Sequence, residues 1–234
     1  SAISRADADV YYYSCAGMIL GMLAMYCDRN NRRLVFRVAR DDDCNPKTVE
    51  LRFNRDRWLY EYGLRRADAV LAQTVWQQKE LLANVGMKST VAGMLVARPF
   101  ASAASTPKDI DVLWVANIRR VKRPQLLLEL ARALPEVTFH MAGAPVPGDE
   151  ALFPAIEAGA RELPNVTFHG GVPYLDIGRL FDRAKVFVNT SELEGFPNTF
   201  LQAWVRGIPV VTTFDPDGLI AREGLGSSHE TVES

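Results

Sequence analysis

Residues 112–142 read VLWVANIRRVKRPQLLLELARALPEVTFHMA, and the fold class follows from this stretch. It holds an apolar run, Val112–Ala116, then an amphipathic run, Arg123–Leu134, and then a second apolar run, Val137–Ala142. Leucines recur at intervals of three and four in the middle run, which is the spacing of one apolar helix face: Leu126, Leu127, Leu130 and Leu134. The stretch therefore predicts two parallel strands joined by a crossover helix.

The same alternation continues toward the C-terminus. Further helices are expected at 151–160, 175–181 and 200–206, and further strands at 166–169, 186–189 and 210–213. This repeated order is typical of an open, doubly wound parallel sheet. Because such sheets bind ligands at the carboxyl ends of their strands, we expect a site in the loops after residues 116, 142, 169, 189 and 213.

A second, less regular α/β pattern precedes this one. Leu34–Val38 and Ala69–Gln73 are expected to be strands, and Arg52–Arg66 and Val75–Val85 helices. Between the two patterns lies a stretch of small residues bounded by prolines, which suits a linker. We predict two Rossmann-like domains, a partial one at 1–98 and one at 110–234, joined by a linker at 99–109. Both domains are expected to be incomplete, so the chain resembles a fragment.

The composition excludes several classes of protein. The chain has 234 residues, 48% of them hydrophobic, so it can bury a sizeable core. The 27 Lys and Arg against 28 Asp and Glu give a net charge of −1, which offers no basic field to nucleic acid. Cys15, Cys27 and Cys44 lack the spacing of a zinc site or a disulfide framework. Reduced thiols, without a signal-peptide pattern, predict a cytoplasmic protein.

One uncharged segment, Val10–Cys27, is 18 residues long, which is near the lower limit for a membrane span. It contains several tyrosines and two glycines, and no basic cluster flanks it to orient it in a bilayer. We expect a buried strand end followed by a helix. Peripheral contact with the inner face of a membrane is the alternative that stays open.

The loop after the fourth strand of the second domain has the residues of an anion and sugar site. Pro197 suits the first turn of a helix, which would leave the amides of Asn198 and Thr199 free for a diphosphate. Gly195 would let the backbone approach a ligand closely. Glu194 would repel phosphate but accept hydrogen bonds from sugar hydroxyls. This combination indicates a nucleotide sugar.

The order of several motifs resembles a known family, the retaining group 1 (family 4) glycosyltransferases of the GT-B fold. The family's donor site has a Glu-Gly-Phe loop and a Gly-x-Pro-Val-Val strand, here Glu194–Gln202 and Gly207–Val211. Pro164–Pro173 is similar to its base-binding strand and loop, and Val115–Lys122 to its basic diphosphate loop. Asp68–Thr74 is similar to the last strand of its acceptor domain.

The resemblance implies transfer of a sugar from a nucleotide diphosphate-sugar to an acceptor hydroxyl, with retention of anomeric configuration and with no metal or other cofactor. Glu194 and Lys122 would be catalytic, the first orienting the donor sugar and the second stabilising the leaving diphosphate. The acceptor would be a glycan, a lipid-linked molecule or a small molecule, and no nucleic acid is expected. Donor binding would fall to loop residues: Arg119, Arg120, Gly170, Gly171, Val172, Gly195, Phe196, Pro197, Asn198, Thr199 and Gln202.

Three positions depart from the family's pattern. Gln202 stands where the family has a second glutamate for the ribose hydroxyls, so a charged acceptor becomes a neutral amide. Asn117 stands where the family's basic loop has an arginine, so Arg119 or Arg120 would have to substitute. Arg40–Asp43 replaces a common acceptor-side histidine, and its aspartates are expected to form a solvated turn.

Two other functions are compatible with these departures. A nucleotide-sugar binding module would bind the donor without turnover, and a GT-B-like epimerase would convert the donor without an acceptor. A dehydrogenase is excluded because no Gly-x-Gly-x-x-Gly follows Val112–Ala116. His140 and His169 are expected to be satisfied strand-end histidines. Three tryptophans are expected to pack in the core or between domains: Trp58, Trp114 and Trp204.

Overall fold

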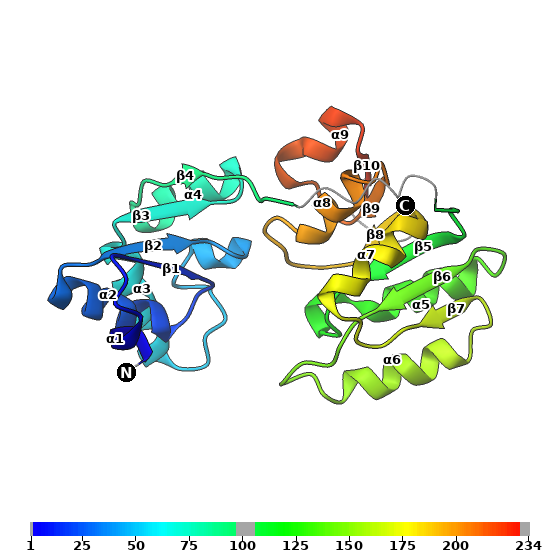
Figure 1. Cartoon of the computed structure of the whole chain (residues 1–234), viewed down its shortest axis with the longest axis horizontal. Coiled ribbons are helices and arrows are strands. Elements are labelled where there is room, and N and C mark those ends of the chain that lie inside the picture. The colour runs from blue at the N-terminus through cyan, green and yellow to red at the C-terminus, as the bar shows by residue number, and fades with distance from the viewer. Residues whose placement is uncertain (1, 97–105, 230–234) are drawn as a thin grey trace. The chain divides into compact units, whose positions relative to one another are not determined.

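A computed structural model describes residues 2–96 and 106–229 of the chain. Its contacts divide the chain into two compact units, the first Ser1–Met94 with Glu194–Phe196 and the second Leu95–Leu193 with Pro197–Ser234 (Figure 1). Each unit is an α/β unit with a parallel sheet, as predicted. Residues 99–105 of the predicted linker lie outside the described residues. The inclusion of Glu194–Phe196 in the first unit was not predicted.

The first unit has a sheet of four parallel strands in chain order: β1 (Val10–Ser14), β2 (Arg33–Arg37), β3 (Ala69–Ala72) and β4 (Thr90–Val91). Its helices are a short α1 (Ala2–Ala6), then α2 (Met18–Asn30), α3 (Asn54–Arg66) and α4 (Val75–Val85). Leu34 and Phe36 alternate with less buried residues of β2, which is the pattern of a strand with one face in the core. The two strands and two helices predicted here are confirmed.

The uncharged segment Val10–Cys27 forms β1 and most of α2, as predicted. Within the ranges that the structure describes, no helix combines the length and apolar character needed to cross a membrane. Glycines bring α2 close to α3, because a Cβ atom on Gly21 would overlap the carbonyl of Leu59 and one on Gly63 would lie 2.6 Å from the carbonyl carbon of Leu20. The two helices therefore lie side by side (Figure 1).

The aspartates after β2 do not form a solvated turn. Asp41–Cys44 is a 3₁₀ helix in which Asp43 is buried and accepts hydrogen bonds from the amides of Ala39 (2.9 Å) and Arg40 (3.1 Å). Burial raises the pKa of the Asp43 carboxyl, and these two amides oppose that shift. The prediction was wrong because sequence composition does not reveal that Asp43 caps this turn from the interior.

The second unit has a six-stranded parallel sheet in the order β10-β9-β8-β5-β6-β7. The strands are β5 (Ile110–Val115), β6 (Phe139–Ala142), β7 (Val166–Phe168), β8 (Ala184–Asn189), β9 (Val210–Thr212) and β10 (Gly226–Ser228). The chain moves outward from β5 through β6 to β7 and then returns to place β8 on the other side of β5. This reversal opens a crevice at the carboxyl ends of β5 and its neighbours.

Successive residues of β5 point to opposite faces of the sheet, and each face has its own core. Trp114 packs in the cluster covered by α5 (Pro124–Ala133) and α6 (Leu152–Arg161). Leu113 packs in the cluster covered by three helices: α7 (Tyr174–Arg183), α8 (Asn198–Trp204) and α9 (Leu219–Glu223). The doubly wound prediction is confirmed, whereas α9 and β10 were not predicted.

The tryptophans differ in burial. Trp114 is fully buried, as expected. Trp204 is half-buried, and its indole N–H donates to the carbonyl of Leu225 at 3.0 Å. Trp58 is 58% exposed, so it does not pack in the core of its own unit, and its packing between domains stays a prediction.

Candidate functional site

A pocket of about 260 Å³ opens at the carboxyl end of the second sheet. Its walls come from the ends of β5 and β6, from the loop between β7 and α7, and from α7 and α8. This is the crevice that the strand order creates. The lining residues are Val115, Ala116, Asn117, Ala142, Gly143, Ala144, Val172, Tyr174, Ile177, Thr199 and Gln202.

Three residues assigned to donor binding line this pocket: Val172, Thr199 and Gln202. The backbone amide of Gly143 donates to the carbonyl of Gly170 at 2.8 Å, which fixes the β7–α7 loop against β6. A Cβ atom on Gly171 would lie 3.2 Å from that of Ala144, so this loop also lies against the pocket wall. The structure thus brings together the predicted base loop and two polar side chains of α8.

The loop that carries Lys122 is tied to the end of β8. Lys122 closes a short 3₁₀ turn, Arg120–Lys122, and the hydroxyl of Thr190 lies 2.7 Å from the Lys122 carbonyl. The indole N–H of buried Trp114 donates to the same hydroxyl at 2.9 Å. Arg123 donates from Nε to the Thr190 carbonyl at 2.7 Å. These bonds hold the Lys122 backbone beside the strand end.

Neither Arg123 nor Thr190 was assigned a role from the sequence. Arg123 adopts a left-handed backbone conformation, with φ of 45°, and its guanidinium also donates to Thr213 Oγ1 at 3.1 Å. It therefore joins the ends of β8 and β9. The sequence did contain a signal for Thr190, because this residue directly follows a largely apolar strand. A threonine that is buried there must find hydrogen-bond partners.

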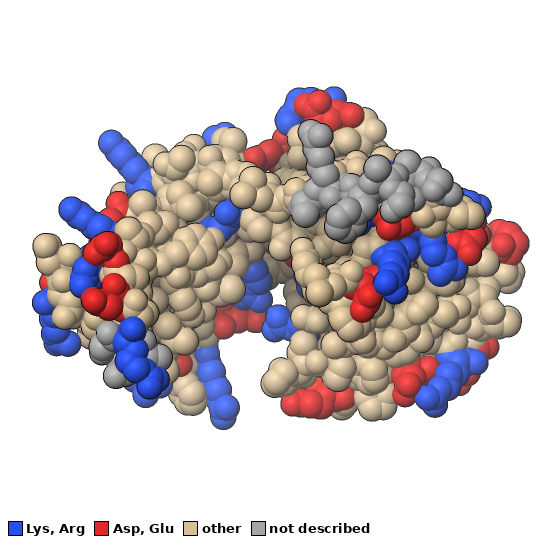
Figure 2. Space-filling view, viewed as in Figure 1, with Lys and Arg blue, Asp and Glu red and all other residues tan. Residues whose placement is uncertain are grey.

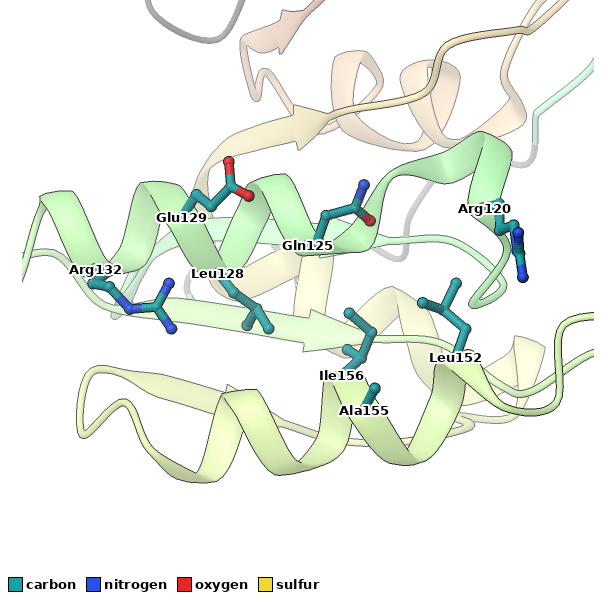
Figure 3. Close-up of a pocket in the computed structure, with 8 residues that line it drawn as sticks. All are labelled: Arg120, Gln125, Leu128, Glu129, Arg132, Leu152, Ala155 and Ile156. Carbon is teal, nitrogen blue, oxygen red and sulfur yellow. The ribbon is translucent and has the colours of Figure 1, made fainter.

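Arg119 and Arg120 both lie near Asp149, with Nε to carboxylate distances of 4.0 Å and 3.5 Å. Arg120 also lines a different hollow, a groove of about 520 Å³ between α5 and α6 (Figure 3). Figure 3 shows Arg120 at one end of this groove, with Leu128 and Ile156 facing each other across it. The assignment of both arginines to the donor stays a prediction, and Arg119 is the better candidate of the two.

Glu194, Gly195 and Phe196 are held by residues of the first unit, to which they belong. The amide of Asp41 donates to the Glu194 carbonyl at 3.2 Å, and the amide of Phe196 donates to Gln73 Oε1 at 2.9 Å. A Cβ atom on Gly195 would overlap Gln73 Oε1. It would also lie 2.7 Å from the backbone carbonyl oxygen of Ala39, so the protein's own packing requires glycine here. That the backbone of Gly195 approaches a ligand stays a prediction.

The helix after this segment begins where it was predicted. Pro197 has φ of −65°, and α8 starts at Asn198. Asn198 is exposed and Thr199 is half-buried at the pocket wall. That their amides bind a diphosphate stays a prediction.

His140 and His169 form a pair at the edge of the second sheet. Their facing ring nitrogens, Nδ1 of His140 and Nε2 of His169, are 2.9 Å apart, so one ring donates to the other. Burial lowers the pKa of both rings, His169 adds to the shift of His140, and the positive charge of Arg183 adds to both. Both rings therefore have a hydrogen-bond partner, as expected, but only His169 lies at the end of a strand, because His140 is the second residue of β6.

The histidine pair predicts how stability depends on pH. Because the pKa values in the folded state lie below the ordinary value of about 6.5, the unfolded chain binds more protons below that pH. The free energy of unfolding should fall as pH drops from about 6.5 to the lowered folded values. Urea titrations should show that the change His140→Gln with His169→Gln removes this slope, whereas His229→Gln, at an exposed histidine, keeps it. An unchanged slope without the pair would contradict the assignment.

Comparison with known proteins identifies the family of this chain. The model of the family described as "Glycosyl transferases group 1" matches residues 98–219. Searched against curated proteins, the sequence has no match.

Several solved structures share the fold. Anabaena HepE, solved with UDP and glucose, has 18% identity and a TM-score of 0.70, with 93% of this chain and 62% of that chain covered. Sucrose-phosphate synthase from Thermosynechococcus elongatus has 20% identity and a TM-score of 0.71, with 93% and 59% covered. S. aureus TarM, solved with UDP among other ligands, has 18% identity and a TM-score of 0.70, with 94% and 45% covered. The chain thus spans less than two thirds of the length of each of these proteins. The structural similarity confirms the predicted GT-B fold.

Proposed function

Because the chain belongs to the group 1 glycosyl transferases, we propose that it transfers a sugar from a nucleotide diphosphate-sugar to an acceptor hydroxyl. The observation that carries this proposal is the pocket at the carboxyl ends of β5 and β6, where the base loop meets Thr199 and Gln202. Its volume of about 260 Å³ suits the nucleoside part of a donor. UDP in the HepE and TarM structures makes a uridine diphosphate-sugar the first donor to test.

In this proposal the donor's base lies against the backbone of Gly170–Val172, and the amide of Gln202 meets the ribose hydroxyls. Lys122, with Arg119, would face the diphosphate, since a lysine is a compact charge for phosphate oxygens. Glu194 would accept hydrogen bonds from the donor sugar. The bond from the anomeric carbon to the diphosphate oxygen breaks, a bond to the acceptor oxygen forms, and the acceptor hydroxyl loses its proton. Positive side chains stabilise the charge that develops on the leaving diphosphate.

Two finer features belong to the same proposal: retention of anomeric configuration and independence of a metal ion. Both follow from the family resemblance, with Lys122 supplying the positive charge that a metal would otherwise supply. Proton NMR of the first-formed product should show the donor's anomeric configuration. Added EDTA should leave the rate within about twofold, because no step needs a divalent cation. An inverted product, or a rate lost in EDTA and restored by Mg²⁺ or Mn²⁺, would overturn the respective feature.

Turnover tests the reaction itself. The full chain is incubated with UDP- and GDP-sugars and an acceptor extract, and both free nucleotide diphosphate and glycosylated product are measured. The proposal expects both products together. Donor binding without turnover would indicate a binding module instead, and conversion of the donor to another sugar nucleotide without acceptor would indicate an epimerase.

Gln202 offers a test in which affinity should rise. Gln202→Glu places a charged acceptor where the ribose hydroxyls are proposed to lie, and hydrogen bonds to charged groups are stronger than neutral ones. We expect UDP to bind about fivefold more tightly to this variant and more weakly to Gln202→Ala. The matched control is Gln125→Glu, an exposed glutamine on α5 that lines the other groove (Figure 3). Equal UDP affinity in all four proteins by calorimetry would contradict the placement.

The acceptor is proposed to be a glycan, a lipid-linked molecule or a small molecule. A lipid-linked acceptor would place the reaction at a membrane surface. Peripheral association with a membrane therefore belongs to this proposal.

A further inference from the structure

Large apolar side chains are exposed on the outer side of α2 and α3 in the first unit. Met22 is 47% exposed, Phe53 52% and Trp58 58%. Met18 and Ile19, in the first turn of α2, are also exposed. We call these five residues the α2–α3 apolar face. Exposed apolar side chains gathered on one surface mark an interaction site more often than the same side chains scattered singly.

Contacts between the two helices make this face continuous. The guanidinium of Arg55, at the start of α3, donates to Met18 Sδ at 3.7 Å. Farther along, Gly21 lies against the backbone of Leu59, the residue next to Trp58. The Trp58 ring stacks on Tyr62, with centroids 5.6 Å apart. These contacts connect Met18 of α2 to the exposed residues at the start of α3, and Met22 follows Met18 and Ile19 by one helical turn.

The two segments that carry this face have an excess of positive charge, and Figure 2 shows Lys and Arg side chains together with acidic ones over the first unit. Residues 18–30 and 52–66 carry six arginines against three acidic residues, a net charge of +3, in a chain whose total is −1. The guanidiniums of Arg52 and Arg55 lie 5.1 Å and 6.0 Å from the centroid of Phe53. An arginine next to an aromatic ring in this way keeps its guanidinium in water while its positive charge lies beside the apolar surface.

We propose that the α2–α3 apolar face binds the surface of an anionic membrane. Trp and Tyr prefer the interface between headgroups and acyl chains, and arginines pair with anionic headgroups. A second copy of this chain is disfavoured as the occupant, because a symmetric contact would bring two faces of charge +3 together. The uncharged segment singled out in the sequence supplies the α2 half of this face.

The proposal names a surface for the peripheral membrane association included in the proposed function. It is tested without a sugar donor, so its failure would leave the donor site untouched. The full chain is mixed with vesicles of phosphatidylcholine and phosphatidylglycerol, or of phosphatidylcholine alone, and co-sedimentation is measured. We expect binding to the anionic vesicles, weaker binding to the neutral ones, and a decrease as salt is raised. Loss of each arginine should weaken binding about fivefold, so Arg29→Gln with Arg52→Gln should weaken it about 25-fold.

Apolar variants separate insertion from charge attraction. Met22→Ser with Trp58→Ser should reduce binding to anionic vesicles at least tenfold. The matched control is Leu82→Ser, which changes a side chain 55% exposed on α4 and should bind as wild type does. Circular dichroism checks that each variant folds, and unchanged UDP affinity in the Met22 and Trp58 variant keeps this test separate from the donor site. Equal vesicle binding by wild type and the apolar variant would overturn the proposal, and so would self-association of the wild type abolished by the same changes.

Discussion

Replacing Thr190 by valine is expected to lower the free energy of unfolding of the second unit by about 2–4 kcal/mol. The valine keeps the shape but removes the oxygen that accepts from the buried indole of Trp114. It also removes the donor to the carbonyls of Lys122 and Arg123, at 2.7 Å and 3.1 Å. Buried groups left without partners account for the size of the loss. Guanidinium titrations followed by tryptophan fluorescence measure it.

A double-mutant cycle tests the cause. Trp114→Phe removes the indole N–H that Thr190→Val leaves without an acceptor, so the combined variant should be less destabilised than the sum of the two changes. Thr190→Ser, which keeps the hydroxyl, should retain most of the stability. Because Thr190 positions Lys122, Thr190→Val should also weaken UDP binding, whereas Thr190→Ser should not. Additive effects, or a valine variant as stable as wild type, would contradict this account of the network.

The second large effect is expected at Gly143. A Cβ atom there would overlap the backbone carbonyl of Ala116 and lie 2.9 Å from Ile118 Cδ1, so Gly143→Ala must push apart the ends of β5 and β6. Overpacking of this kind typically costs about 1–3 kcal/mol, and here it also distorts the pocket wall. We expect loss of stability together with at least a tenfold loss of UDP affinity.

Gly93 provides the control for this change. A Cβ atom on Gly93 would meet nothing within 4 Å, so Gly93→Ala should leave both stability and UDP binding near wild type. Thermal unfolding with and without UDP measures both properties in one experiment. A Gly143→Ala protein that melts and binds as wild type does would show that the ends of β5 and β6 are not packed as described.

Periodicity predicted most of the fold because each element of the second unit buries one face. The helix predicted at Arg123–Leu134 is α5, but the prediction placed its buried face on Leu126, Leu127, Leu130 and Leu134. The structure buries Leu127, Leu128 and Ala131 and exposes Leu134, because the sheet and α6 contact α5 from a slightly different direction. α9 and β10 were missed because they are only five and three residues long, which is too short to show a period.

The candidate site was only partly predictable, for a physical reason. Val172, Thr199 and Gln202 follow strands whose carboxyl ends must share one edge, so topology alone brings them together. The hydrogen bond between Phe196 and Gln73 joins residues 123 positions apart, and no local pattern signals it. Gln77, fully buried on α4, accepts a hydrogen bond from the backbone N–H of Gln73 at 2.8 Å and so fixes the Gln73 backbone. Its role depends on tertiary contacts that only the folded chain shows.

In the proposed function, the pocket of the second unit binds the nucleotide of a nucleotide sugar, and Lys122 contacts its diphosphate. The most direct measurement is a calorimetric titration of the full chain with UDP, UDP-sugars and the GDP equivalents. We predict saturable binding of one nucleotide class, weakened about tenfold or more by Lys122→Ala and unchanged by Lys185→Ala, at an exposed lysine on β8. Glu194→Ala should weaken binding of the sugar nucleotide but not of the free diphosphate. No saturable binding by the folded chain, or equal binding by the Lys122 and Lys185 variants, would contradict the claim.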